Sequence, residues 1–288
     1  MGVHAACSDE WGASWKPLSI WLVAACSPPF WLALDRGNSD IFVFTVVVLA
    51  VALVIAELRV IPGVIVAIAG VLKIFTLGSG LMVVAMRRGR WWTTCTWVIG
   101  SLLAVAVLWQ DLPLISARTP RSDWMSFGVS VVPIRFQEFL GPWEGNGRAI
   151  GLIAAAFFIL GVWAVLLLER LAGVRVSRDA LLAAFVEDRR AAAVLLAGSG
   201  TFLTAYLVGT GYDYRLMFLL LVVGAFLLVG RWTFGVAFAV LMWCSGRWTF
   251  FGDAADFVWL AVAPALSVLV ARLTARLMRS NSMQKLYS

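Results

Sequence analysis

Charge is scarce in this sequence, and histidine is almost absent. Only 14% of the 288 residues are charged, whereas a soluble protein has about a quarter. The single histidine, His4, stands in the N-terminal tail, and the four cysteines (Cys7, Cys26, Cys95 and Cys244) have no metal-ligand spacing. These shortages argue against a soluble globular domain and against a histidine-based metal site, and we expect neither a metal nor a cofactor.

Apolar residues, by contrast, make up 62% of the chain and are arranged in long runs. The run AIGLIAAAFFILGVWAVLLL (149–168) is long enough to cross ~30 Å of hydrocarbon at ~1.5 Å per residue. Because lipid offers the backbone no hydrogen-bond partners, such a run must be helical. The sequence therefore predicts an all-α, polytopic helical membrane protein.

The apolar runs divide into about ten membrane segments, several of them short. The stretch 60–86 contains Lys73, and it is either one long tilted helix or two short helices that turn around this lysine. The segments lie at 18–34, 41–56, 60–86 (counted as two), 92–109, 149–168, 191–208, 216–230, 233–246 and 257–273.

Arginine-rich stretches between the segments predict which ends face the cytoplasm. Arg87, Arg88 and Arg90 mark one such stretch, the loop 169–190 is a second, and the basic tail 274–288 is a third. If 60–86 is two short helices, all three lie on the same side of the membrane as both termini. If it is one helix, these stretches keep their side, but DRGNSD (35–40) moves to the cytoplasm. The net charge of +7 then reflects topology and not nucleic-acid binding, because no basic tract with interleaved aromatics occurs.

This topology predicts a simple organisation along the chain. A cytoplasmic tail (1–17) precedes a helical membrane domain (18–273), and the basic cytoplasmic tail follows it. Within the domain, the long loop 110–148 faces outward, on the side opposite to the arginine-rich stretches.

Ionisable groups in or beside the apolar runs form three clusters, and a charge there costs at least ~2.5–3.5 kcal/mol. The first is SPPFWLALDRGNSD (27–40), the second is Lys73 within GVLKIF, and the third is GTGYDYR (209–215). Each has a structural interpretation, as a polar turn, a snorkelling lysine or a capped loop. Each also has a functional one, as a group that binds an anionic substrate. The candidate substrate-binding residues are Asp35, Arg36, Asn38, Asp40, Lys73, Tyr212, Asp213 and Arg215.

The order and the residues of these clusters resemble those of glycosyltransferase family 87, a family of bacterial membrane proteins of the GT-C type. Members show a proline, an apolar stretch and a D/E-R-G-N-x-D motif, which is matched here at 35–40. A K-L-Y-P-like turn follows in the family, and only its lysine is kept here, as Lys73. A D-Y-R-L segment is matched at 213–216. The resemblance spans 25–230, and it implies a turn at Lys73 that places all three clusters on the outer face.

The resemblance also implies a function. Proteins of this type transfer a sugar from a polyprenyl-phosphate donor to a glycan or glycolipid acceptor outside the cytoplasm. This implies a multi-pass protein of a bacterial cell (inner) membrane, with membrane lipid as its surroundings and no nucleic-acid partner. Arg36, Lys73 and Arg215 would hold the lipid phosphate, while Asp40 and Asp213 would contact sugar hydroxyls.

One departure from the family pattern concerns catalysis. The family carries its catalytic acid in a large outer loop that precedes the D-R-G-N motif, whereas here the motif already begins at Asp35. We therefore expect an N-terminal part to be missing and the chain to be inactive alone, with no catalytic residue assigned. The alternative is a non-catalytic multi-pass protein, either a lipid or solute transporter or a scaffold subunit.

Overall fold

The computed structural model describes residues 15–35, 37–58, 60–86, 91–110, 126–127, 147–171, 175–208, 211–245 and 252–286. These residues are helical almost throughout, which confirms the all-α prediction. After a first helix at Trp15–Ala25, the helices are α2 (Pro28–Asp35), α3 (Ser39–Ile55), α4 (Ile61–Leu72), the 3-10 helix η1 (Ile74–Ser79), α5 (Gly80–Ala85), α6 (Trp91–Leu108), α9 (Gly147–Leu171), α10 (Arg175–Glu187), α11 (Arg189–Val208), the 3-10 helix η2 (Asp213–Phe218), α12 (Leu219–Leu228), α13 (Trp232–Cys244) and α14 (Gly252–Leu286).

Three of the described helices are long and apolar enough to cross a membrane, at Leu152–Leu171 in α9, Arg189–Leu207 in α11 and Val258–Asn281 in α14. A fourth span results if the first helix and α2, which are bent by 53° at their junction, count as one. The other apolar helices are shorter than a full span. The basic tail expected at 274–288 is, as far as the structure describes it, the continuation of α14 to Leu286.

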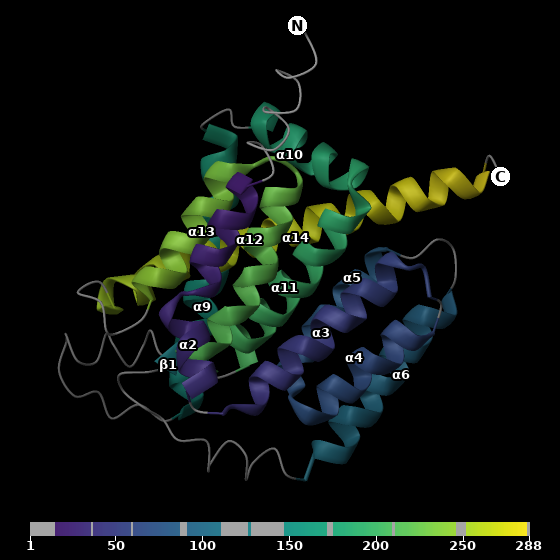
Figure 1. The fold of residues 1–288 in the computed structure, drawn as a ribbon, viewed down its shortest axis with the longest axis horizontal. Coiled ribbons are helices and arrows are strands. Elements are labelled where there is room, and N and C mark those ends of the chain that lie inside the picture. The colour runs from purple at the N-terminus through teal and green to yellow at the C-terminus, as the bar shows by residue number, and fades with distance from the viewer. Residues whose placement is uncertain are drawn as a thin grey trace, which may run out of the picture.

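Helix α11 forms the centre of the bundle, between α12 on one side and the η1–α5 segment on the other (Figure 1). Of its span, 78% is buried inside the chain. Small residues make this close packing feasible. A Cβ built on Gly200 would lie 2.0 Å from the carbonyl oxygen of Gly78, so the two backbones touch.

Helix α9 has the opposite environment, because only 6% of its span is buried. It contacts α14 along one side and leaves Leu152, Trp163 and Leu171 exposed by 73%, 66% and 74%. An exposed apolar surface of this size is typical of contact with lipid or with another apolar partner.

Breaks in the first half of the chain occur where the sequence contains helix-ending residues. Pro28 and Pro29 lie at the bend after the first helix, because a proline disrupts the preceding turn. Gly37 adopts a positive φ of 55° between α2 and α3, a conformation that glycine takes without strain. Lys73 is extended (φ −150°, ψ 106°), so 60–86 is two short helical pieces that meet at this lysine.

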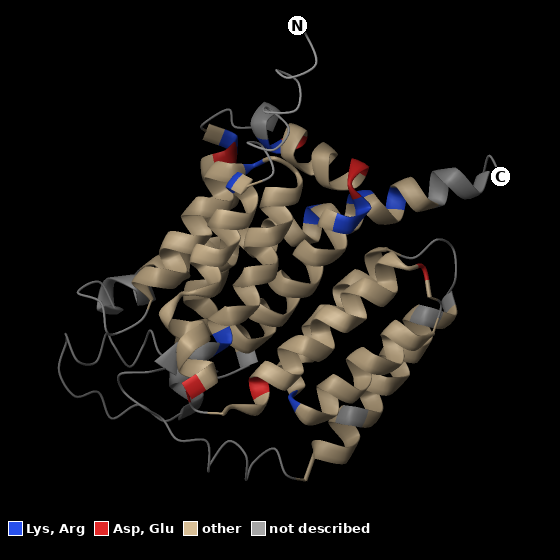
Figure 2. Ribbon diagram, in the orientation of Figure 1, with Lys and Arg blue, Asp and Glu red and all other residues tan. Residues whose placement is uncertain are grey.

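Charged residues gather at two opposite ends of the bundle, and the ribbon between them carries almost none (Figure 2). One end contains the junction of α2 and α3, and the other contains α10 together with the neighbouring part of α14 (Figures 1 and 2). The outer loop 110–148 lies largely outside the described residues. Its strand β1 (Ser126–Phe127) pairs antiparallel with β2 (Gly211–Tyr212), which places it beside the GTGYDYR segment.

Candidate functional site

The three charged clusters of the sequence converge at one end of the bundle. Asp40 lies in the first turn of α3, Lys73 lies between α4 and η1, and Arg215 lies in η2. Lys73 Nζ is 3.1 Å from Asp40 Oδ1, and Arg215 Nε is 3.6 Å from Asp40 Oδ2. We call these three residues the Asp40 centre.

The position of Asp40 follows from how α3 begins. Asn38 is the N-cap residue, and its side-chain oxygen accepts a hydrogen bond of 3.0 Å from the backbone N–H of Asp40. An asparagine is among the preferred N-cap residues, and an acid in the first turn interacts favourably with the helix dipole. The DRGNSD segment therefore starts a helix and directs an acid toward the interior at its first turn.

Lys73 is held by the chain that follows it. Its carbonyl oxygen accepts a hydrogen bond of 2.8 Å from the hydroxyl of Thr76, and the Thr76 carbonyl accepts one of 2.7 Å from the hydroxyl of Ser79. Both hydroxyls belong to buried residues. The Lys73 carbonyl also accepts a hydrogen bond of 3.0 Å from the backbone N–H of Thr76, so the turn that follows Lys73 is held by backbone and side-chain bonds together.

Aromatic rings support Arg215. Its guanidinium carbon lies 4.7 Å from the centroid of the Phe75 ring, within the range of a cation–π interaction. Phe75 contacts Phe218 edge to face at 5.7 Å, and Phe44 lies 5.6 Å from the same Phe218 ring. Arg215 is thus fixed by an apolar wall on one face and by Asp40 at its Nε atom.

The charges in the Asp40 centre do not balance. The Asp40 side chain is fully buried, whereas those of Lys73 and Arg215 are 30% and 17% exposed. The two cations meet the carboxylate as ion pairs without hydrogen-bond geometry. Within the described part of the chain, the terminal nitrogens of Arg215 make no hydrogen bond or ion pair. Two cations around one carboxylate leave one positive charge and free donors, which suits an anion.

The remaining predicted residues lie around this centre or outside the described part. Asp35 ends α2 and is exposed, and Asn38 is the α3 cap. Arg36 is outside the described residues. The backbones of Tyr212 and Asp213 lie in β2 and at the start of η2, immediately before Arg215, and their side chains are not among those described.

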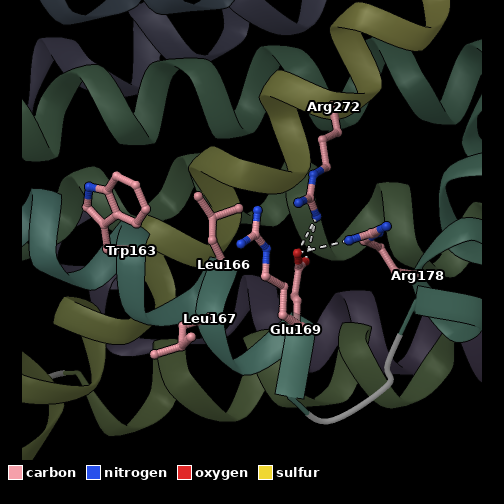
Figure 3. A pocket seen from close by; sticks show the side chains of 7 residues that line it. Trp163, Leu166, Leu167, Glu169, Arg178 and Arg272 are labelled. Carbon is pink, nitrogen blue, oxygen red and sulfur yellow. Dashed lines mark hydrogen bonds and ion pairs between the residues drawn. The ribbon is translucent and has the colours of Figure 1, made fainter.

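A second charged site, at the opposite end of the bundle, was not predicted from the sequence. Glu169 accepts hydrogen bonds from Arg178 (2.9 Å) and from Arg272 (2.7 Å), so α9, α10 and α14 meet at one carboxylate (Figure 3). A pocket of about 390 Å³ opens beside it. The sequence marked 169–190 and the C-terminal arginines only as cytoplasmic flanks, because pairing between helices far apart in the chain leaves no local pattern.

Among the described residues, no group of three or more histidine, cysteine, aspartate or glutamate side chains could hold a metal ion. No protein-family model matches the chain, and neither a curated protein nor a solved structure matches it.

Proposed function

We propose that this chain is a GT-C-like membrane protein whose Asp40 centre binds the phosphate of a polyprenyl-phosphate-linked sugar. The sugar would pass to a glycan or glycolipid acceptor on the extracytoplasmic side. One observation carries the proposal: segments far apart in the sequence bring Lys73 and Arg215 within 3.1 and 3.6 Å of the same buried carboxylate.

Membrane insertion is supported by the distribution of apolar surface. Among the described helices, three are long and apolar enough to cross a membrane, the bent pair at the start is a fourth if it counts as one span, and six more are apolar but shorter. The charged residues that the structure describes gather at the two ends of the bundle (Figure 2). A bilayer is the environment in which such a surface is stable, because exposed apolar side chains then meet hydrocarbon. A bacterial inner membrane is part of this proposal.

The chemistry of sugar transfer suits a cationic centre. When the bond between the sugar and the phosphate breaks, the leaving phosphate gains negative charge, and preorganised cations stabilise that charge. Lys73 supplies a point charge, and Arg215 supplies donors that can grip two phosphate oxygens. Arg36 is a third proposed phosphate ligand.

Asp40 has a positioning role in this scheme, because it holds both cations in place. Asp40 and Asp213 are also the carboxylates proposed for sugar hydroxyls. Because Asp40 is fully buried, it reaches a hydroxyl only if its ion pairs rearrange when the substrate binds. The base that removes the proton from the acceptor hydroxyl is not assigned to any residue of this chain.

The proposal is tested by binding of a polyprenyl monophosphate to the purified full chain in detergent. Arg215→Gln and Lys73→Gln each remove one cation, and each is expected to weaken binding by about tenfold or more, because a hydrogen bond to a charged group contributes ~1.5–3 kcal/mol. Arg279→Gln is the matched control, since Arg279 is exposed on α14 and outside the Asp40 centre. Unchanged binding in both cation variants would refute the proposal.

A transporter is the second candidate, favoured by the broken helices. The 53° bend before α2 and the break at Lys73 interrupt helices within the bundle, and the break carries a cation that pairs with the buried Asp40 carboxylate. Transporters likewise have discontinuous helices that line a binding site. In this case, reconstituted vesicles would take up a solute, uptake would depend on Lys73 or Asp40, and polyprenyl monophosphate would not bind.

A further inference from the structure

We propose that the pocket between α9, α10 and α14 binds the headgroup of an anionic phospholipid. This site lies at the end of the bundle opposite to the Asp40 centre, so it is independent of the proposed sugar transfer. We call it the Glu169 pocket. It is lined by Trp163, Leu166, Leu167, Glu169, Arg170, Arg178 and Arg272.

The lining divides into an apolar and a basic part. Trp163, Leu166 and Leu167 come from the last turns of α9, on the side that leads along the membrane-spanning stretch (Figure 3). Trp163 and Leu167 are 66% and 56% exposed, so they face the surroundings of the bundle. Arg170 lies next to them in the last turn of α9, and Arg178 and Arg272 reach the pocket from α10 and α14. An apolar surface that ends at a group of arginines matches a lipid, whose chains end at a charged headgroup.

The charge of the site is positive even after its internal ion pairs are counted. Glu169 pairs with Arg178 and Arg272, and Asp179 pairs with Arg276 at 2.6 Å. Arg170 also lines the pocket, and within the described residues it makes no ion pair or hydrogen bond. Four arginines therefore face two acids, which leaves two positive charges beside the pocket.

Glu169 explains why the arginines stay at the pocket. Its carboxylate is shared between α10 and α14, whose Arg178 and Arg272 both point toward it (Figure 3). The shared carboxylate keeps two like charges close together without an anion present. Arg178 also pairs with Asp179 at 3.5 Å, so among the described contacts it is Arg170 and the remaining nitrogens of Arg272 that offer donors to phosphate oxygens. A basic pocket between helices at the cytoplasmic end of a membrane protein is suited to an anionic headgroup.

The occupant we propose is a phospholipid with net negative charge, such as phosphatidylglycerol. A zwitterionic lipid carries the same phosphate, but its choline group adds a cation that the arginines repel. Free inorganic phosphate lacks the chains that would lie on Trp163 and Leu167. We therefore expect the pocket to prefer lipids with an anionic headgroup and to require their acyl chains for binding.

The test is lipid retention by the purified full chain, measured by native mass spectrometry from detergent that contains equal amounts of phosphatidylglycerol and phosphatidylcholine. We expect the chain to retain phosphatidylglycerol preferentially. Arg170→Gln should lower that retention about fivefold, since a basic residue near an anionic lipid contributes roughly that factor. Arg170 is exposed and has no internal pair, so the variant should fold normally. Arg170→Lys should retain most of the binding.

Two controls make the result specific. Arg190→Gln removes an exposed arginine from the same end of the bundle, outside the pocket, and it should leave retention unchanged. Arg215→Gln, in the Asp40 centre, should also leave it unchanged, which separates this proposal from that of sugar transfer. Equal retention of both lipids, an equal loss in Arg190→Gln, unchanged retention in Arg170→Gln, or full competition by millimolar inorganic phosphate would each overturn the proposal.

Discussion

Lys73 and Asp40 form an ion pair of 3.1 Å between the break at the end of α4 and the first turn of α3. The carboxylate of Asp40 is fully buried, and Arg215 is its second partner. Removing one partner of a buried ion pair leaves an uncompensated charge, which costs more than the pair itself contributes. The three residues should therefore differ in how much stability their substitution removes.

Asp40→Ala should be the most damaging substitution in this centre. It leaves both Lys73 and Arg215 without a counter-charge, and breaking a buried pair costs about 3–5 kcal/mol. Lys73→Met should cost less, because Arg215 still neutralises Asp40. The measurement is the Tm of each purified variant in detergent. Asp35→Ala, at an exposed acid on the same end of the bundle, should leave Tm unchanged, and a comparable loss there would contradict the assignment.

Gly200→Ala should destabilise the bundle. The added Cβ would lie 2.0 Å from the Gly78 carbonyl oxygen, so α11 and η1 must separate, and overpacking of this kind costs about 1–3 kcal/mol or more. Gly224→Ala on α12 is the matched control, since its nearest neighbour is Trp21 Nε1 at 3.6 Å. Thermal unfolding in detergent should show a lower Tm for the first variant only. An equal change in Tm for the two variants would contradict the close contact between Gly200 and Gly78.

Asp188 begins α11 as an N-cap. Its Oδ1 accepts hydrogen bonds from the backbone N–H groups of Arg190 (2.9 Å) and Ala191 (3.0 Å). Asp188→Ala should lower the free energy of unfolding by about 1 kcal/mol, because loss of an N-cap typically costs that much. Asp188→Asn keeps the acceptor and should retain most of the stability. An equal loss in the asparagine and alanine variants would point to the charge and not to the cap, because both variants remove the charge and only alanine removes the acceptor.

The two charged ends should face opposite sides of the membrane. A single cysteine at exposed Ser39, at the Asp40 end, and one at exposed Arg190, at the other end, would be introduced separately after replacement of the four native cysteines. A membrane-impermeant thiol reagent added to intact cells should label the cysteine at position 39 but not the one at position 190. Labelling of both or of neither would contradict the proposed topology.

Much of the helical architecture was predictable from the sequence because lipid leaves the backbone little choice. Long apolar runs must be helices, and the segments predicted at 149–168 and 191–208 lie within a few residues of α9 and α11. The last segment was predicted to end at 273, whereas α14 continues to Leu286. The residues alone left two interpretations for Lys73, the family resemblance implied a turn, and the structure shows a break there. The breaks near the start of the chain were also predictable, because proline restricts the backbone and glycine frees it locally. They occur at Pro28, Pro29 and Gly37.

Tertiary structure alone decided which charges meet. The residues themselves marked Asp40, Lys73 and Arg215 as three separate polar interruptions, and the family resemblance placed them on one face of the membrane. That Lys73 and Arg215 pair with the same carboxylate follows only from the packing of α3, η1 and η2. The pairing of Glu169 with both Arg178 and Arg272 was likewise not predicted from the sequence. Ion pairing acts over a few ångströms in space with no regard to separation along the chain. An apolar run, in contrast, is a property of consecutive residues. The helices could therefore be predicted from the sequence, whereas the contacts between their charged side chains could not.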